Sequence, residues 1–265
     1  MNMPWITPSW TDAGPAQARQ AVVFLHGIGG GRDGWVPQQA HVARLGWRSL
    51  AWDMPGYGSS PMVSPYDFDA LAQALWQMLD AAQVQRAVLV GHSMGAMVAL
   101  QAWTQTPERI TAMVLAASSP AFGHTDGDFQ QQFLAQRLAP LDAGHTMADI
   151  ADRLIPTMAT PGGDGAKLRP AHQSMSAVPP GTYRAALQAL VRFEQRAALP
   201  TLTVPVLCLA AEHDRTAPPA VMARMAQKIP GARYACLAGG GHLLHLEQPE
   251  AFNDELASFL KDVKP

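Results

Sequence analysis

The sequence predicts an α/β protein in which helices cover both faces of a largely parallel, doubly wound β-sheet. Between residues 21 and 117, short apolar runs alternate with segments of helical spacing, which is the order of consecutive βα units. The apolar runs are continuous, as in Ala21–Leu25 (AVVFL), and such runs are typical of strands buried on both faces. This alternation of strand and helix segments stops at Ser118 and resumes at Val204, so a helical insertion is expected between these two positions.

Apolar spacing and the flanking glycines and prolines place the elements along the chain. Strands are expected at 21–25, 47–52, 87–90, 109–117, 204–210 and 233–237, with a short strand or hairpin at 5–11. Helices are expected at 37–45, 67–82, 219–228 and 250–263, and after the glycine-rich turn at 91–95. Within the insertion, helices are expected at 130–138, 147–154 and 183–196, with loops at 160–165 and 178–181.

Composition limits the classes of partner. The chain has 265 residues, 48% of them hydrophobic, which suits a single domain with a full core. With a net charge of −2, the chain lacks the excess of basic residues typical of proteins that bind nucleic acid or an anionic membrane. No apolar run is long enough to span a bilayer. The N-terminal MNMPWITPSWTDAG does not read as a secretory signal. We therefore expect a cytoplasmic protein with Cys208 and Cys236 as free, buried thiols.

The stretch AVLVGHSMGAMVAL, residues 87–100, carries the pattern G-x-S-x-G between a strand and a helix. Gly91 and Gly95 flank Ser93 at the two positions where side chains would collide with the backbone of a tight turn. Such a turn places Ser93 at a helix N-terminus, where backbone N–H groups stabilise negative charge. The alternative interpretation is a glycine-rich βα turn with an incidental serine, which the flanking strand and helix disfavour.

A serine nucleophile needs a base, and the base needs an acid that orients it. Asp214 follows the expected strand VPVLCLA, and His242 follows the last expected strand. The chain order Ser93, Asp214, His242 is the order of nucleophile-elbow hydrolases. Because loops at the carboxyl ends of parallel strands converge on one crevice, the three side chains are expected to meet there.

Other polar residues compete for these roles. His26 and His92 flank the expected site, but lone histidines are usually satisfied by local hydrogen bonds. His245 is an alternative base. Glu212 is an alternative acid, disfavoured because it lies nearer the end of the strand. Asp53 ends another strand and is a further carboxylate near the expected site.

Cofactor binding is not expected. The glycines at 29–31 lack the spacing and the lysine of a nucleotide-binding loop. The histidines and carboxylates do not cluster with the spacing of metal ligands. We expect neither a metal nor a cofactor.

Four blocks of sequence resemble those of the α/β-hydrolase fold superfamily: FLHGIGG, DMPGYGSS, GHSMGAMVAL, and the pair AEHDRTAP with GGGHLLHLEQPEAFNDELASFL. Together they extend over nearly the whole chain. The resemblance implies the α/β-hydrolase fold, with a core from residues 1–120 and 201–265 and a mobile helical lid at 121–200, inserted after the sixth core strand. The short N-terminus leaves little room for the first two strands of that fold, and Ala211 stands where the family often has glycine.

The same resemblance implies roles for individual residues. Ser93 would be the nucleophile, His242 the general base and acid, and Asp214 its partner. The distance from His242 to residues 247–250 matches the family block, which favours His242 over His245 as the base, and Asp53 would brace the turn after its strand. The backbone N–H groups of Ile28 and Met94 would form the oxyanion hole.

Within the superfamily, the second half of the chain is most similar to 3-oxoadipate enol-lactonases and related small-ester hydrolases, on residues 178–183, the segment around Phe193 and the block EQPEAFN. The leading interpretation is therefore hydrolysis of a small carboxylic ester or lactone. A carbon–carbon bond hydrolase of meta-cleavage products is the second, although His92 and Leu243 depart from the residues common in that group. Ser93 excludes the aspartate-nucleophile mechanism of dehalogenases and epoxide hydrolases. A non-catalytic ligand-binding member of the fold is the third.

Overall fold

A computed structural model describes residues 6–123 and 128–263 of the chain. Its centre is a seven-stranded sheet in the order β1-β3-β2-β4-β5-β6-β7. Every neighbouring pair is parallel except β1 and β3, which are antiparallel. The strands are β1 (Trp10–Ala13), β2 (Gln20–Leu25), β3 (Arg48–Trp52), β4 (Arg86–His92), β5 (Ile110–Ala116), β6 (Val206–Ala211) and β7 (Arg233–Leu237). The predicted fold class is confirmed.

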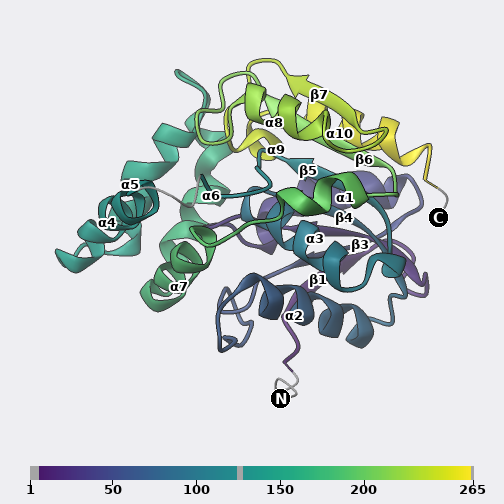
Figure 1. The fold of residues 1–265 in the computed structure, drawn as a ribbon, viewed down its shortest axis with the longest axis horizontal. Coiled ribbons are helices and arrows are strands. Elements are labelled where there is room, and N and C mark those ends of the chain that lie inside the picture. The colour runs from purple at the N-terminus through teal and green to yellow at the C-terminus, as the bar shows by residue number, and fades with distance from the viewer. Residues whose placement is uncertain (1–5, 124–127, 264–265) are drawn as a thin grey trace.

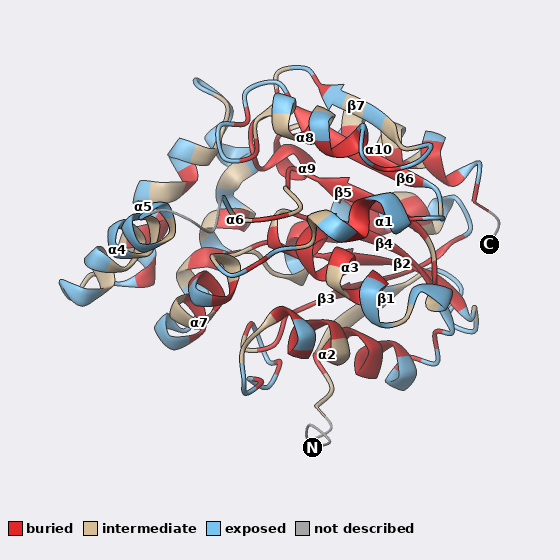
Figure 2. Cartoon of the chain, viewed as in Figure 1, coloured by how far each residue is buried: buried red, intermediate tan, exposed pale blue. Residues whose placement is uncertain are grey.

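Helices cover both faces of this sheet (Figure 1). Alternate residues of the strands point to opposite faces, so Val23 packs in one apolar cluster and Val22 in a second. The first cluster includes side chains of α2 (Phe68–Ala81), α3 (Met94–Gln105) and α8 (Pro219–Ala226). The second includes side chains of α1 (Val36–Arg44) and α10 (Pro249–Leu260). Figure 2 shows the inner strands buried between these layers, which explains their continuous apolar runs.

The register of the strands aligns the loops that follow them in two neighbouring pairs. Leu25, the last residue of β2, pairs with Gly91 of β4, so the loops that follow these two strands leave the sheet side by side. Ala211 and Leu237, the last residues of β6 and β7, also pair. The loops before Asp214 and His242 therefore start from the same level of the sheet.

A helical insertion separates β5 from β6. It consists of α4 (Phe129–Asp142), α5 (Met147–Met158), α6 (Gly165–Ala177) and α7 (Pro180–Leu190), which gather at one side of the molecule (Figure 1). The insertion follows the fifth described strand and not a sixth, because within the described residues only β1 precedes β2. The prediction missed α6, which contains Pro170, and placed α7 too late in the chain.

Three further findings concern the remaining predictions. The first strand lies at Trp10–Ala13, later than the expected 5–11, and residues 1–5 lie outside the described residues. Cys208 is buried as predicted, but Cys236 is exposed, because alternate residues of the edge strand β7 face solvent. Among the described helices, none has the length and apolarity needed to cross a membrane.

Candidate active site

Ser93 occupies a sharp turn between β4 and α3. Its backbone has φ 52° and ψ −118°, a region that residues other than glycine rarely adopt. Two hydrogen bonds hold it there. The Ser93 N–H donates to the carbonyl of Ala116 at 2.9 Å, and the Ser118 hydroxyl donates to the Ser93 carbonyl at 2.9 Å. The side chain is thus presented beyond the end of the strand and is half-buried.

The two glycines of the G-x-S-x-G pattern are required by close backbone approach, as predicted. A Cβ on Gly91 would collide with the backbone of Ala96 in the first turn of α3. A Cβ on Gly95 would collide with the carbonyl of Leu25 at the end of β2. These contacts let α3 start immediately beside the sheet, which keeps the Ser93 turn tight.

Asp214 and His242 meet in the interior, each about 3% exposed. His242 Nδ1 lies 2.9 Å from Asp214 Oδ2, so the imidazole N–H donates to the carboxylate. The other carboxylate oxygen, Oδ1, accepts from the N–H groups of Thr216 at 2.7 Å and Ala217 at 2.9 Å. Burial raises the pKa of Asp214, but the hydrogen bond and charge of His242 and these two N–H groups outweigh it, so the pKa lies below its ordinary value.

The second ring nitrogen of His242 faces Ser93. The distance from His242 Nε2 to Ser93 Oγ is 3.1 Å, within hydrogen-bond range. In a neutral imidazole, the nitrogen that donates to Asp214 carries the proton, which leaves Nε2 as an acceptor for the serine hydroxyl. The structure therefore brings together the three side chains that the sequence singled out.

The loop after β2 passes directly beside the serine. A Cβ on Gly27 would lie 2.9 Å from Ser93 Cβ, so only glycine allows this approach. His26 anchors the loop: its Nδ1–H donates to the Gly27 carbonyl at 2.8 Å, and its Nε2 accepts from the Met54 N–H at 2.9 Å. Ile28 is the next residue of this loop, and Met94 is the first residue of α3, where helix N–H groups lack acceptors within the helix.

The other candidate residues have structural contacts instead. His92 Nε2 donates to the His242 carbonyl at 2.8 Å, and His245 stacks on Trp35 with ring centroids 4.3 Å apart. Burial lowers the pKa of His26, of His92 (to about 3) and of His245, so these rings are neutral. Glu212 accepts from the Gly239 N–H and does not reach His242.

Asp53 braces its turn as expected. Its carboxylate accepts from the Arg32 N–H at 3.0 Å and from the Ser9 hydroxyl at 3.1 Å. The Ser60 hydroxyl donates to the Asp53 carbonyl at 2.6 Å. These contacts tie the loop after β3 to the loop after β2.

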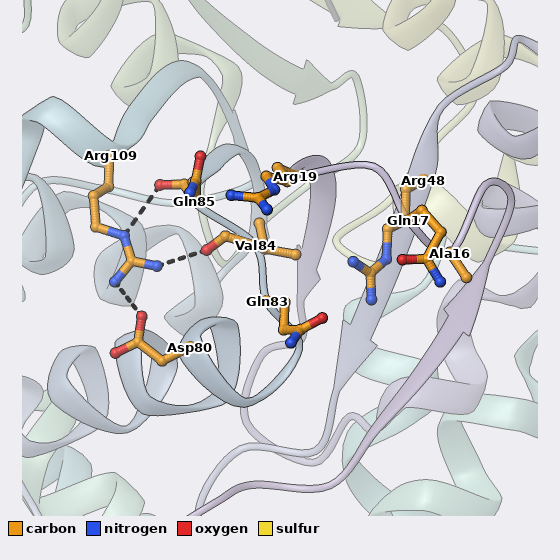
Figure 3. Close-up of a pocket in the computed structure, with 9 residues that line it drawn as sticks. All are labelled: Ala16, Gln17, Arg19, Arg48, Asp80, Gln83, Val84, Gln85 and Arg109. Carbon is orange, nitrogen blue, oxygen red and sulfur yellow. Dashed lines mark hydrogen bonds and ion pairs between the residues drawn. The ribbon is translucent and has the colours of Figure 1, made fainter.

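A wide surface cleft of about 460 Å³ lies away from Ser93 (Figure 3). Among the residues that line it, Arg48 is the first residue of β3, and Arg109 immediately precedes β5. Both lie at the amino-terminal ends of the strands, whereas Ser93 follows the carboxyl end of β4. Both guanidinium groups are already bound: Arg48 to Asp12, and Arg109 to Asp80 and two carbonyls. This cleft is therefore a poor candidate for the substrate site.

A second, small cavity of about 30 Å³ is lined by the loop after β2 and by the helical insertion. The insertion contributes Met158, Ser174 and Met175 to its lining, and His245 lines it as well. It has room for one water molecule but not for an ester. Among the described residues, no group of three or more His, Cys, Asp or Glu side chains is arranged to hold a metal ion.

The sequence profile of the α/β hydrolase fold matches residues 20–249. The chain belongs to the α/β-hydrolase fold family. A relative from Variovorax paradoxus, provisionally named as the carbamate hydrolase RutD, is 32% identical to this α/β hydrolase over 259 residues, 94% of each chain. The pimeloyl-[acyl-carrier protein] methyl ester esterase of Neisseria meningitidis serogroup A is 26% identical over 93% of this chain and 78% of its own length.

Solved structures support the fold of this α/β hydrolase. The enol-lactonase from Burkholderia xenovorans LB400 superposes with a TM-score of 0.88, at 22% identity and 98% coverage of both chains. An esterase from Thermogutta terrifontis superposes with a TM-score of 0.86, at 23% identity and full coverage of both chains. Because both identities are low, these likenesses establish the architecture alone. The sequence relatives named as hydrolases support a hydrolase.

Proposed function

We propose that this protein is a serine hydrolase that cleaves a small carboxylic ester or lactone through an acyl-enzyme on Ser93. The observation that carries the proposal is the continuous chain of hydrogen bonds from Asp214 through His242 to Ser93, with distances of 2.9 and 3.1 Å. A serine that only ended a βα turn would have no need of a buried imidazole and carboxylate in this arrangement.

In the proposed mechanism, Ser93 Oγ attacks the substrate carbonyl while His242 Nε2 takes the hydroxyl proton. The carboxylate of Asp214 holds the imidazole in the reactive tautomer and stabilises the imidazolium that forms. His242 then gives the proton to the leaving alkoxide, and the acyl group remains on Ser93. Water, deprotonated by His242, attacks this acyl-enzyme. The imidazolium then gives its proton to Ser93 Oγ as the acid leaves, which restores both the serine hydroxyl and the neutral imidazole.

The developing oxyanion would be bound by the N–H groups of Ile28 and Met94. The support for this assignment is positional: Gly27 brings its loop against the Ser93 side chain, and Met94 follows Ser93 at the N-terminus of α3. Two such donors aimed at one oxygen stabilise the tetrahedral intermediate where charge develops. No step of this mechanism requires a metal or a cofactor.

We assign the helical insertion, residues 121–200, as a lid over the site. It belongs to the same domain as the core, which comprises residues 1–120 and 201–265. In support, α5 and α6 supply Met158 and Met175 to the small cavity that the loop after β2 also lines. A cytoplasmic location remains the prediction of the sequence.

Carbamate hydrolysis is a second candidate, favoured by the 32% identity to the Variovorax relative along nearly its whole length. The same triad can attack the carbonyl of a carbamate ester, which expels the alkoxide or phenoxide and leaves a carbamoyl group on Ser93. The carbon–carbon hydrolase and the non-catalytic binder remain as outcomes of the test below.

A substrate panel tests the proposal. Turnover of p-nitrophenyl acetate and butyrate, an enol-lactone, a p-nitrophenyl carbamate and a meta-cleavage product is measured for wild type and Ser93→Ala. We expect ester or lactone turnover that Ser93→Ala lowers by about three to six orders of magnitude. Preference for the carbamate or the ring-cleavage product would support the corresponding alternative. Turnover that is negligible on every substrate, or equal in both proteins, would contradict an enzymatic role for Ser93.

A further inference from the structure

The turn between α5 and α6 lies directly against the loop that carries His242. The His242 N–H donates to the carbonyl of Met158, the last residue of α5, at 2.7 Å. The Thr160 hydroxyl donates to the Gly239 carbonyl at 3.0 Å. A Cβ on Gly241 would lie 2.7 Å from Met158 O and from Thr160 N, so the approach requires glycine at position 241. The insertion thus supports the backbone of His242 itself.

One buried carboxylate joins the two segments. Glu247 lies in α9 (Leu244–Glu247) and is 7% exposed. Its Oε1 accepts from the Gly241 N–H at 3.1 Å, and its Oε2 accepts from the Thr160 N–H at 2.7 Å. The ammonium of Lys167, in α6, donates to the Glu247 carbonyl at 2.9 Å. The side chain therefore binds one donor next to His242 and one donor on the insertion.

We propose that Glu247 is a positioning residue that acts through His242, by fixing the Gly241–His242 backbone to the α5–α6 turn. The proposal rests on the proposed function, in which His242 is the base. Two N–H donors face the same buried position, and a carboxylate satisfies both because it offers an acceptor oxygen to each. Without the Glu247 carboxylate, both N–H groups would lose their hydrogen-bond acceptor.

Small displacements of the base matter for rate. The proton moves between Ser93 Oγ and His242 Nε2, which lie 3.1 Å apart. A displacement of about 1 Å in such geometry can lower a rate on the order of 100-fold. Since Glu247 holds the residue next to His242, its loss is expected to disturb this distance. Its side chain binds Gly241 and Thr160 and not Ser93, so substrate binding is expected to change little.

The first test compares Glu247→Gln with wild type on p-nitrophenyl butyrate. The glutamine side chain would keep one acceptor oxygen and turn an NH₂ group toward the other donor, so we expect kcat to fall about 10–100-fold with KM within threefold. The matched control is Glu250→Gln, a solvent-exposed carboxylate in the first turn of α10, which is expected to keep wild-type kcat. Wild-type kcat in a folded Glu247→Gln would overturn the proposal.

A double-mutant cycle separates positioning from a general loss of structure. If Glu247 acts through His242, adding Glu247→Gln to His242→Ala lowers the residual turnover by less than about twofold. An additional loss as large as that in wild type would overturn the proposal. Glu247→Asp provides the same test if Glu247→Gln does not fold. Its shorter carboxylate cannot reach both donors, so kcat should fall at least about threefold, and wild-type kcat would overturn the proposal.

The outcomes are distinguishable from failure of the proposed function. If Ser93→Ala leaves turnover unchanged, the serine mechanism is wrong, whatever Glu247 does. If Ser93→Ala abolishes turnover while Glu247→Gln and Glu247→Asp keep wild-type kcat, the serine mechanism stands and the positioning role is wrong.

Discussion

Gly95 and the carbonyl of Leu25 are in such close contact that a Cβ on Gly95 would overlap the carbonyl oxygen. The contact joins the first turn of α3 to the end of β2. Gly95→Ala is therefore expected to lower the free energy of unfolding by about 1–3 kcal/mol or more, because the backbone must shift to admit the methyl group. Urea unfolding monitored by circular dichroism measures this loss.

Gly165→Ala is the matched control for that substitution. Gly165 is the first residue of α6, and nothing lies within 4 Å of its potential Cβ. We expect the control to be neutral or stabilising by less than about 1 kcal/mol. Equal stability of Gly95→Ala and Gly165→Ala would show that the tight packing of α3 on β2 is wrong.

Asp214→Asn is expected to leave the fold intact and to lower kcat about 10⁴-fold. An amide at position 214 can donate to His242 Nδ1, which would place the ring proton on Nε2, where an acceptor is needed. Ester turnover and circular dichroism provide the two measurements. In Glu212→Gln we expect kcat within about threefold of wild type, since Glu212 contacts Gly239 instead of His242. The opposite ranking would make Glu212 the acid.

Acid is expected to destabilise the protein through three buried histidines. Burial lowers the pKa values of His26, His92 and His245 below the 6.5 of the unfolded chain. The unfolded chain therefore binds more protons than the native protein below pH 6.5. Above pH 6.5 these three histidines leave the free energy of unfolding unchanged. Below it, the free energy of unfolding falls as the pH approaches the native pKa values, by up to about 1.4 kcal/mol per pH unit for each histidine.

Urea unfolding between about pH 7 and pH 5 measures this dependence. His92→Gln is expected to reduce the slope by about the contribution of one histidine. His213→Gln, at an exposed position, is expected to leave it unchanged. A stability that is constant or rises on acidification would contradict the neutral, buried state of these rings.

The two cysteines are expected to differ in reactivity. Burial raises the pKa of the Cys208 thiol to about 12, whereas Cys236 is exposed on the edge strand β7. Ellman's reagent should therefore modify one thiol in the native protein and a second after unfolding. Two rapidly modified thiols in the native protein would contradict the burial of Cys208, and Cys236→Ser should abolish the native reaction.

Much of the core and the site could be predicted because local signals agreed there with the tertiary structure. The continuous apolar runs of β2 and β4 reflect burial on both faces, and the glycines around Ser93 reflect close backbone contacts. Asp214 and His242 could be placed because each follows a strand whose end is fixed in the sheet. Their meeting follows from topology.

The remaining features depend on contacts that local patterns do not contain. The helix α6 escaped prediction because Pro170 lies inside it and its apolar face is short. The exposure of Cys236 depends on β7 being the edge strand, which the sequence of β7 does not reveal. The contact of Glu247 with Thr160 joins residues 87 positions apart, and the donors of Thr216 and Ala217 to Asp214 are backbone groups without a residue-type signal.

The most direct test of the central claim is the site at which a fluorophosphonate modifies the protein. Intact-mass and peptide mass spectrometry of wild type should show a single adduct on Ser93, since this hydroxyl is hydrogen-bonded to the His242 imidazole. Ser93→Ala should remain unmodified, and His242→Ala should react far more slowly. An adduct on another residue, or equal labelling of wild type and Ser93→Ala, would contradict the account of Ser93 as the nucleophile.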